Sequence, residues 1–120
     1  MTEAALSEKN SDAPAGNYVA AAKLVDLEDG QGLFVELEGV QIVLFKTEDD
    51  GVHAIGNVCP HQGAPLAEGW YEQEECVVTC ALHAWDFDVR TGQRVNGPES
   101  VPSYDTRIVN GIVEVALNNI

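Results

Sequence analysis

Short runs of apolar residues recur along most of the chain, separated by Gly, Asp and Asn. Leu33, Val35 and Leu37 occupy every second position of one run, and Val113, Val115 and Leu117 do the same in another. This period of two is typical of strands with one buried face, and no stretch has the pattern of a long helix. The pattern predicts strands at 18–24, 33–38, 41–46, 52–55, 75–80, 85–89, 104–109 and 112–117.

Two tight turns indicate how neighbouring runs are joined. Asn110-Gly111 is a strong signal for a two-residue hairpin, because both residues tolerate positive φ. Gly39-Val40 is predicted to join two earlier runs. We therefore predict an all-β chain whose main body is an antiparallel β-sandwich or a partly open barrel.

Two short segments each pair a thiol with an imidazole. They are Cys-Pro-His at 59–61 and Cys-Ala-Leu-His at 80–83, with eighteen residues between His61 and Cys80. Two thiolates and two imidazoles suit a 2Fe-2S cluster in which the cysteines hold one iron and the histidines the other. Zinc is the alternative, although zinc fingers place two cysteines together and then two histidines. The predicted cofactor-binding and metal-ligating residues are Cys59, His61, Cys80 and His83.

Longer motifs surround these four residues. The first is Cys-Pro-His-Gln-Gly-Ala-Pro-Leu at 59–66, followed by Glu-Gly-Trp at 68–70; the second is Cys-Ala-Leu-His-Ala-Trp-Asp-Phe-Asp-Val-Arg-Thr-Gly at 80–92. Over about residues 18–117 the chain resembles the Rieske-type iron-sulfur proteins, and most closely the small Rieske-type ferredoxins. The resemblance implies one 2Fe-2S cluster and a cluster-binding β subdomain at about 57–88, inserted in the larger β domain. It also implies that a loop at 97–102 covers the cluster.

Length and composition bound the organisation of the chain. The 120 residues allow one domain, which we place at 17–120 after a polar, flexible tail at 1–16. The formal charge of −14, from 20 acidic and 6 basic residues, disfavours nucleic acid and anionic membranes as partners. Without an 18-residue apolar run or a signal-like start, we expect a soluble, cytoplasmic protein that does not bind a membrane.

The chain departs from the respiratory Rieske proteins near the cluster. Two further cysteines of those proteins correspond here to Ala64 and Leu82, and two hydroxyl-bearing residues correspond to Trp85 and Phe87. Fewer hydrogen bonds to the sulfurs, with carboxylates nearby, favour the oxidised form. We therefore expect a potential toward the bottom of the Rieske range of roughly −150 to +300 mV.

These features lead to three functional hypotheses. In the leading one, the chain is a ferredoxin that passes single electrons from a flavin-containing ferredoxin reductase to a terminal oxygenase, as in aromatic hydrocarbon catabolism. In the second, it is the Rieske-like small subunit of a complex such as assimilatory nitrite reductase. In the third, it is a non-redox module that binds zinc or nothing. We expect no enzymatic turnover by the chain itself, because only His53 remains to bind a catalytic iron.

Residues beyond the motif receive simpler interpretations. Cys76 is expected to be a small buried residue in a strand, and His53 an exposed strand residue. Trp70 and Trp85 are expected to pack under the cluster. Acidic side chains near the ligand segments are expected to steer a basic partner; they are Glu68, Glu72, Asp86 and Asp88.

Overall fold

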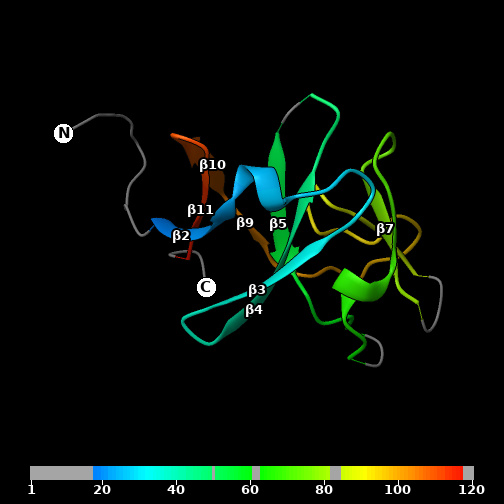
Figure 1. Ribbon diagram of the computed structural model, residues 1–120. Coiled ribbons are helices and arrows are strands. Elements are labelled where there is room, and N and C mark those ends of the chain that lie inside the picture. The colour runs from blue at the N-terminus through cyan, green and yellow to red at the C-terminus, as the bar shows by residue number, and fades with distance from the viewer. Residues whose placement is uncertain (1–17, 50, 61–62, 82–84, 118–120) are drawn as a thin grey trace.

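A computed structural model describes residues 18–49, 51–60, 63–81 and 85–117 of the chain. These residues form three open antiparallel sheets and two short 3-10 helices (Figure 1). The elements are β2 (Tyr18–Lys23), η2 (Leu24–Asp26), β3 (Leu33–Leu37), β4 (Val40–Lys46), β5 (Val52–Gly56), η3 (Leu66–Glu68), β6 (Trp70–Glu72), β7 (Val77–Thr79), β8 (Asp86–Asp88), β9 (Ser103–Tyr104), β10 (Thr106–Val109) and β11 (Ile112–Ala116). The all-β, antiparallel prediction is confirmed.

Two sheets make the larger body of the molecule. One has the strand order β3-β4-β5-β9 and the other β10-β11-β2. Their shared core includes Leu44 from β4 and Val113 and Val115 from β11, all fully buried. The alternation seen in the sequence thus places one face of β11 against the neighbouring sheet.

The third sheet, β6-β7-β8, forms a smaller layer on the other side of β4. Val43 and Phe45 of β4 lie in one core cluster with Val78 of β7 and Phe87 of β8, whereas Ile42 and Leu44 lie in the core of the larger body. All four of these β4 residues are fully buried. A central strand covered on both faces explains why β4 is a continuous apolar run.

Most of the predicted strands are confirmed, with limits that differ by one or two residues. Both predicted hairpins form, and Asn110-Gly111 lies at the turn between β10 and β11 with φ of 53° and 80°. The other turn is one residue earlier than predicted: Glu38 and Gly39 have φ of 52° and 85°, whereas Val40 already pairs with Leu37. A pair of positive φ values is what a two-residue hairpin requires.

Three details of the strand prediction were wrong. The run at 104–109 is divided between β9 and β10, which belong to different sheets. β6 was missed, because its three residues lie next to an acidic stretch and are recognisable as a strand only from their pairing with β7. Cys76 lies in the turn before β7 with a φ of 58°, half-buried rather than inside a strand.

In the described part of the chain, neither helix has the length and apolar character needed to cross a membrane.

Candidate metal centre

The first predicted ligand, Cys59, opens a tight loop after β5. Its N–H donates to the carbonyl of Ala64 at 2.9 Å, and its carbonyl accepts from the N–H of Gly63 at 2.8 Å. Gly63 has a φ of 75°, which suits glycine at this bend. The thiol-bearing residue is 1% exposed, so the loop holds Cys59 inside the protein.

Asn57 holds the base of this loop. Its carbonyl accepts from Leu66 N–H at 2.6 Å, and its side-chain Oδ1 accepts from Ala67 N–H at 2.8 Å. Asn57 is itself 3% exposed, so these bonds satisfy polar groups that water does not reach. Sequence reasoning did not single out Asn57, because an asparagine two residues before a cysteine carries no signal of its own.

The second predicted ligand, Cys80, follows β7 and opens a similar loop. Its N–H donates to the carbonyl of Trp85 at 2.8 Å, so this loop also closes five residues after its cysteine. Cys80 is fully buried, in the same core cluster as Cys59. The structure therefore brings the two predicted cysteines into one apolar core, each at the start of a closed loop.

The other two predicted ligands, His61 and His83, lie outside the described residues. Within the described residues, no three His, Cys, Asp or Glu side chains gather in a group that could bind a metal. The ligand set of two thiolates and two imidazoles thus stays a prediction. The pair of buried cysteines fits the thiolate half of a 2Fe-2S site, since iron-sulfur clusters are held by cysteine thiolates in low-exposure environments.

Gly69 allows the two ligand segments to approach. A Cβ atom at this position would lie 2.1 Å from the carbonyl oxygen of Thr79, the residue before Cys80. Any side chain would therefore push β7 away.

Phe87 and Trp85 pack in the same core as the two buried cysteines. Phe87 is fully buried in the cluster of residues that holds both cysteines, and Trp85 is half-buried against that cluster. The two rings are 6.5 Å apart. The packing role expected of Trp85 is supported, but that of Trp70 was wrong, because the Trp70 side chain is 63% exposed.

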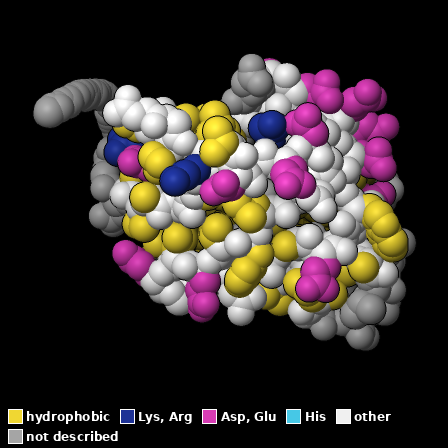
Figure 2. All heavy atoms as spheres, in the orientation of Figure 1, with side chains coloured by type: hydrophobic (Ala, Val, Ile, Leu, Met, Phe, Trp, Pro, Cys, Tyr) yellow, Lys and Arg dark blue, Asp and Glu magenta, His cyan; other side chains and the backbone are white. Residues whose placement is uncertain are grey.

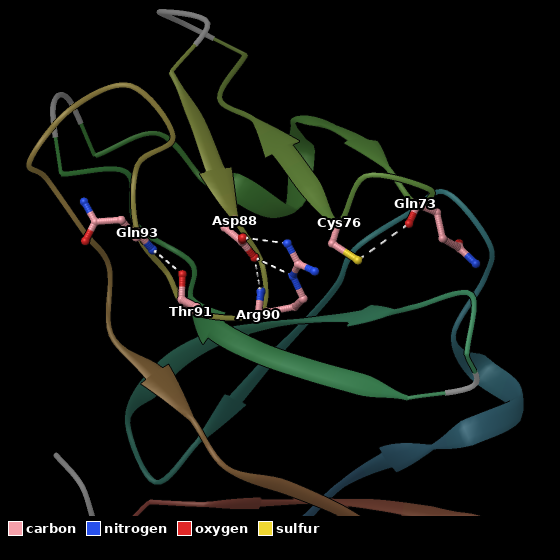
Figure 3. Close-up of polar contacts among 6 residues, drawn as sticks. All are labelled: Gln73, Cys76, Asp88, Arg90, Thr91 and Gln93. Atoms are coloured by element: carbon pink, nitrogen blue, oxygen red, sulfur yellow. Dashed lines mark hydrogen bonds and ion pairs between the residues drawn. The ribbon is translucent and has the colours of Figure 1, made fainter.

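The two carboxylates of β8 have separate partners. Asp86 accepts a 2.6 Å hydrogen bond from the Thr79 hydroxyl. Asp88 accepts from the Arg90 backbone N–H at 2.8 Å and from its guanidinium at 3.0 and 2.9 Å (Figure 3). The Arg90 side chain is the main reason that the pKa of Asp88 is lowered. Asp88 is thereby less available to steer a basic partner than was expected.

Acidic side chains are nevertheless abundant on the surface. Figure 2 shows many Asp and Glu side chains and few Lys or Arg on one face. Glu68 and Glu72 are both exposed; along the chain they lie two residues before and two residues after the exposed Trp70. This combination of negative charge with one large apolar side chain suits transient contact with a basic partner surface.

His53 lies in β5, opposite Phe45 of β4. It is half-buried rather than exposed, and it lines an open hollow with Asp49, Cys76 and Arg90. Burial is the main cause that lowers the pKa of His53, opposed in part by the charge of Asp49. The strand assignment was correct, but the expected exposure was wrong.

Comparison with known proteins identifies the family of the chain. The family model of the Rieske 2Fe-2S domain matches residues 17–112. The ferredoxin component of the naphthalene 1,2-dioxygenase system of Pseudomonas putida is 31% identical over 103 residues, covering 84% of this chain and 96% of the relative. The ferredoxin component of an alkene monooxygenase system of Xanthobacter autotrophicus is 35% identical, covering 66% of this chain and 63% of the relative.

Solved structures show the same similarity. The ferredoxin of carbazole 1,9a-dioxygenase from Nocardioides aromaticivorans has a TM-score of 0.78 and 30% identity, with 84% of this chain and 98% of that chain covered. A protein described as the small subunit of an NADH-dependent nitrite reductase from Mycobacterium tuberculosis has a TM-score of 0.75 and 31% identity, covering 82% and 92%. The matched domain is a 2Fe-2S domain, which confirms the predicted cofactor. With its two buried cysteines at the start of matching loops, this chain belongs to the Rieske 2Fe-2S domain family.

Proposed function

We propose that the chain is a one-electron carrier that takes electrons from a flavin-containing ferredoxin reductase and passes them to a terminal oxygenase. In this proposal Cys59 and Cys80 hold one iron of the cluster, and His61 and His83 hold the other. The observation that carries it is the burial of Cys59 and Cys80 together at the start of two similarly closed loops. When bound, the cluster supplies a one-electron redox couple.

The protein's own residues have three tasks in this function. The backbone bonds made by Cys59 and Cys80 position the backbones of the two cysteines for cluster binding. Phe87, which is fully buried, keeps water away from the inner side of the site. Exposed acidic side chains attract a basic partner and raise the rate of association, and added salt weakens this attraction.

The names of the relatives support this assignment over an enzymatic one. The relatives from Pseudomonas putida and Xanthobacter autotrophicus are ferredoxin components of oxygenase systems, and this chain matches 96% of the length of the first. We propose accordingly that the chain has no turnover of its own, and that it works in the cytoplasm between two protein partners.

Reconstitution tests the proposal directly. The cluster-loaded protein is mixed with a flavin-containing ferredoxin reductase and NADH, and then with the terminal oxygenase of a naphthalene or carbazole dioxygenase system. We expect rapid bleaching of the cluster absorbance followed by product formation that depends on this protein. A cluster that the reductase leaves oxidised, or that reduces no oxygenase of this class, would contradict the assignment.

The second candidate is a fixed subunit of a nitrite reductase. It is favoured by the similarity to the Mycobacterium tuberculosis protein, at a TM-score of 0.75. Gel filtration of the protein with each partner separates the two functions. A free carrier elutes alone at micromolar concentration, whereas a fixed subunit elutes together with the large subunit of the nitrite reductase.

A further inference from the structure

An arginine outside the predicted ligand motifs stacks on the second ligand segment. The guanidinium carbon of Arg94 lies 3.6 Å from the centre of the Trp85 ring. A cation at this distance over an indole face is attracted by the negative charge of the ring face. The stack joins Arg94 to the residue whose carbonyl closes the Cys80 loop.

Several contacts hold the Arg94 side chain in this position. Its Nη1 pairs with Oε1 of Glu99 at 2.8 Å, and the Arg94 backbone N–H donates to the Glu99 carbonyl, also at 2.8 Å. The side chain of Arg94 is only 23% exposed. A Cβ atom on Gly97 would lie 2.7 Å from Nη1 and from Oε1, so a glycine leaves the space that this ion pair occupies.

The backbone around Arg94 pairs with strand β8 of the small sheet β6-β7-β8. Arg94 forms an isolated antiparallel bridge with Phe87, and the N–H of Val95 donates to the carbonyl of Asp86 at 2.7 Å. The arginine is thus held at its backbone by β8 and at its side chain by Trp85 and Glu99. Cys80, Trp85 and Arg94 form a connected series from the buried thiol to the charged group.

Three of the other described Lys and Arg side chains have different partners. Lys46 pairs with Asp29 at 3.1 Å, Arg90 with Asp88 at 2.9 Å, and Arg107 with Glu114 at 2.6 Å. Arg107 also stacks on an aromatic ring, that of Tyr18, at 4.1 Å. That second stack lies in the β10-β11-β2 sheet, so it repeats the chemistry of Arg94 away from the ligand loops.

We propose that Arg94 is a positioning residue for the cluster. It holds Trp85, whose carbonyl accepts the hydrogen bond of the Cys80 N–H, and it places one positive charge beside this bond in a chain of net charge −14. The charge favours the reduced cluster, because reduction adds a negative charge nearby. This inference rests on the proposed function, since it requires a cluster bound at Cys80.

The test compares two matched arginine variants as cluster-loaded proteins. Arg94→Gln removes the stacked charge at the loop, and Arg107→Gln removes the equivalent charge on Tyr18. Cluster loss is followed as the decay of visible absorbance in excess iron chelator, and the midpoint potential by voltammetry. Urea unfolding of the cluster-free proteins measures how much general stability each variant loses.

We expect Arg94→Gln to lose its cluster about tenfold faster than the wild type, which corresponds to about 1.4 kcal/mol. Its midpoint potential falls below that of the wild type, and Arg94→Lys, which keeps the charge, restores the potential. Arg107→Gln leaves both quantities unchanged. Equal rates of cluster loss in the two Gln variants, or an unchanged potential in Arg94→Gln, would overturn the proposal.

A milder pair of variants covers the case in which Arg94→Gln takes up no cluster. Glu99→Gln keeps Arg94 but removes the ion pair that holds its side chain, and Glu114→Gln removes the corresponding ion pair of Arg107. We expect about threefold faster cluster loss in the first variant than in the second, the effect of one partly exposed ion pair; equal rates would contradict the role of Arg94. A wild-type protein without a Cys/His cluster would instead refute the proposed function.

Discussion

The phenol of Tyr71 donates a 2.7 Å hydrogen bond to the backbone carbonyl of Lys46. This bond joins β6 of the small sheet to the end of β4, and the Tyr71 ring also packs on Phe45 at 4.5 Å. Burial raises the pKa of Tyr71 well above its ordinary value, so the group stays a neutral donor. Tyr71 therefore connects the layer that carries Cys80 to the central strand of the molecule.

Replacing Tyr71 by Phe removes this bond and keeps the ring. We expect the free energy of unfolding to fall by about 1 to 2 kcal/mol, because a part-buried hydrogen bond between the two layers is lost. Urea unfolding of the cluster-free protein measures it. Tyr104→Phe is the matched control, since Tyr104 is also buried but no hydrogen bond of its hydroxyl is found in the described residues. A smaller loss in Tyr71→Phe than in Tyr104→Phe would contradict this role.

The three cysteines are expected to differ in their response to serine. Cys59→Ser and Cys80→Ser replace a soft ligand by a hard one, so both variants should lose the visible absorbance of the cluster. Cys76→Ser should keep it, because Cys76 is half-buried in a turn and its Sγ contacts the Gln73 carbonyl at 3.8 Å (Figure 3). Iron and sulfide analysis of the purified proteins measures the outcome. A full cluster in either of the first two variants would show that the ligand assignment is wrong.

Phe87→Tyr adds a hydroxyl donor within the core that holds both cysteines. A hydrogen bond to a cluster sulfur stabilises the reduced state, so the midpoint potential should rise. About 1 kcal/mol of added hydrogen bonding corresponds to about 40 mV for one electron. Phe34→Tyr adds the same hydroxyl at a position of β3 that is 46% exposed, and should leave the potential unchanged. A fall, or equal potentials in the two variants, would contradict this account.

His53 should make stability depend on pH. Burial lowers its pKa, so the folded protein holds His53 neutral while the unfolded chain still binds a proton. The contribution of neutral His53 to the free energy of unfolding is therefore fully present above the unfolded pKa of about 6.5. It is lost as the pH falls toward the lowered pKa of the folded protein. Urea unfolding of the wild type and of His53→Gln, from about pH 7.5 to about pH 5.5, measures it. The wild type should lose more stability than the variant over this range; equal losses would contradict the cause given for the shift.

The strands that could be predicted from sequence are those whose signal is local. In β11, Val113 and Val115 lie on the buried face two positions apart, and Asn110-Gly111 supplies the positive φ values that its hairpin requires. The pattern of β4 also revealed a strand, and its continuous apolar run followed from being covered on both faces. Such features depend on residues that are adjacent in the chain.

The features that were missed depend on pairing across the fold. β6 forms a strand because Tyr71 pairs with Val78, and nothing in its own three residues requires it. The chain leaves one sheet for another at Asp105, between β9 and β10, which a continuous β-rich run conceals. Arg94 is separated from Trp85 by eight residues, so their stack could be found only from the structure.

The cysteine half of the candidate site was proposed from two short motifs, and its role in binding a metal stays a prediction. The structure adds the burial of Cys59 and Cys80 and the backbone bonds that hold them. The histidine half lies outside the described residues and depends on the motif alone.

The electron paramagnetic resonance spectrum of the dithionite-reduced protein tests the proposed ligand set most directly. Imidazole ligation of one iron lowers the average g value below that of a 2Fe-2S cluster held by four cysteines. The account predicts this low average, with the unpaired electron on the iron bound by His61 and His83. An average g value typical of four thiolates, or a silent spectrum from a protein that contains stoichiometric zinc, would contradict it.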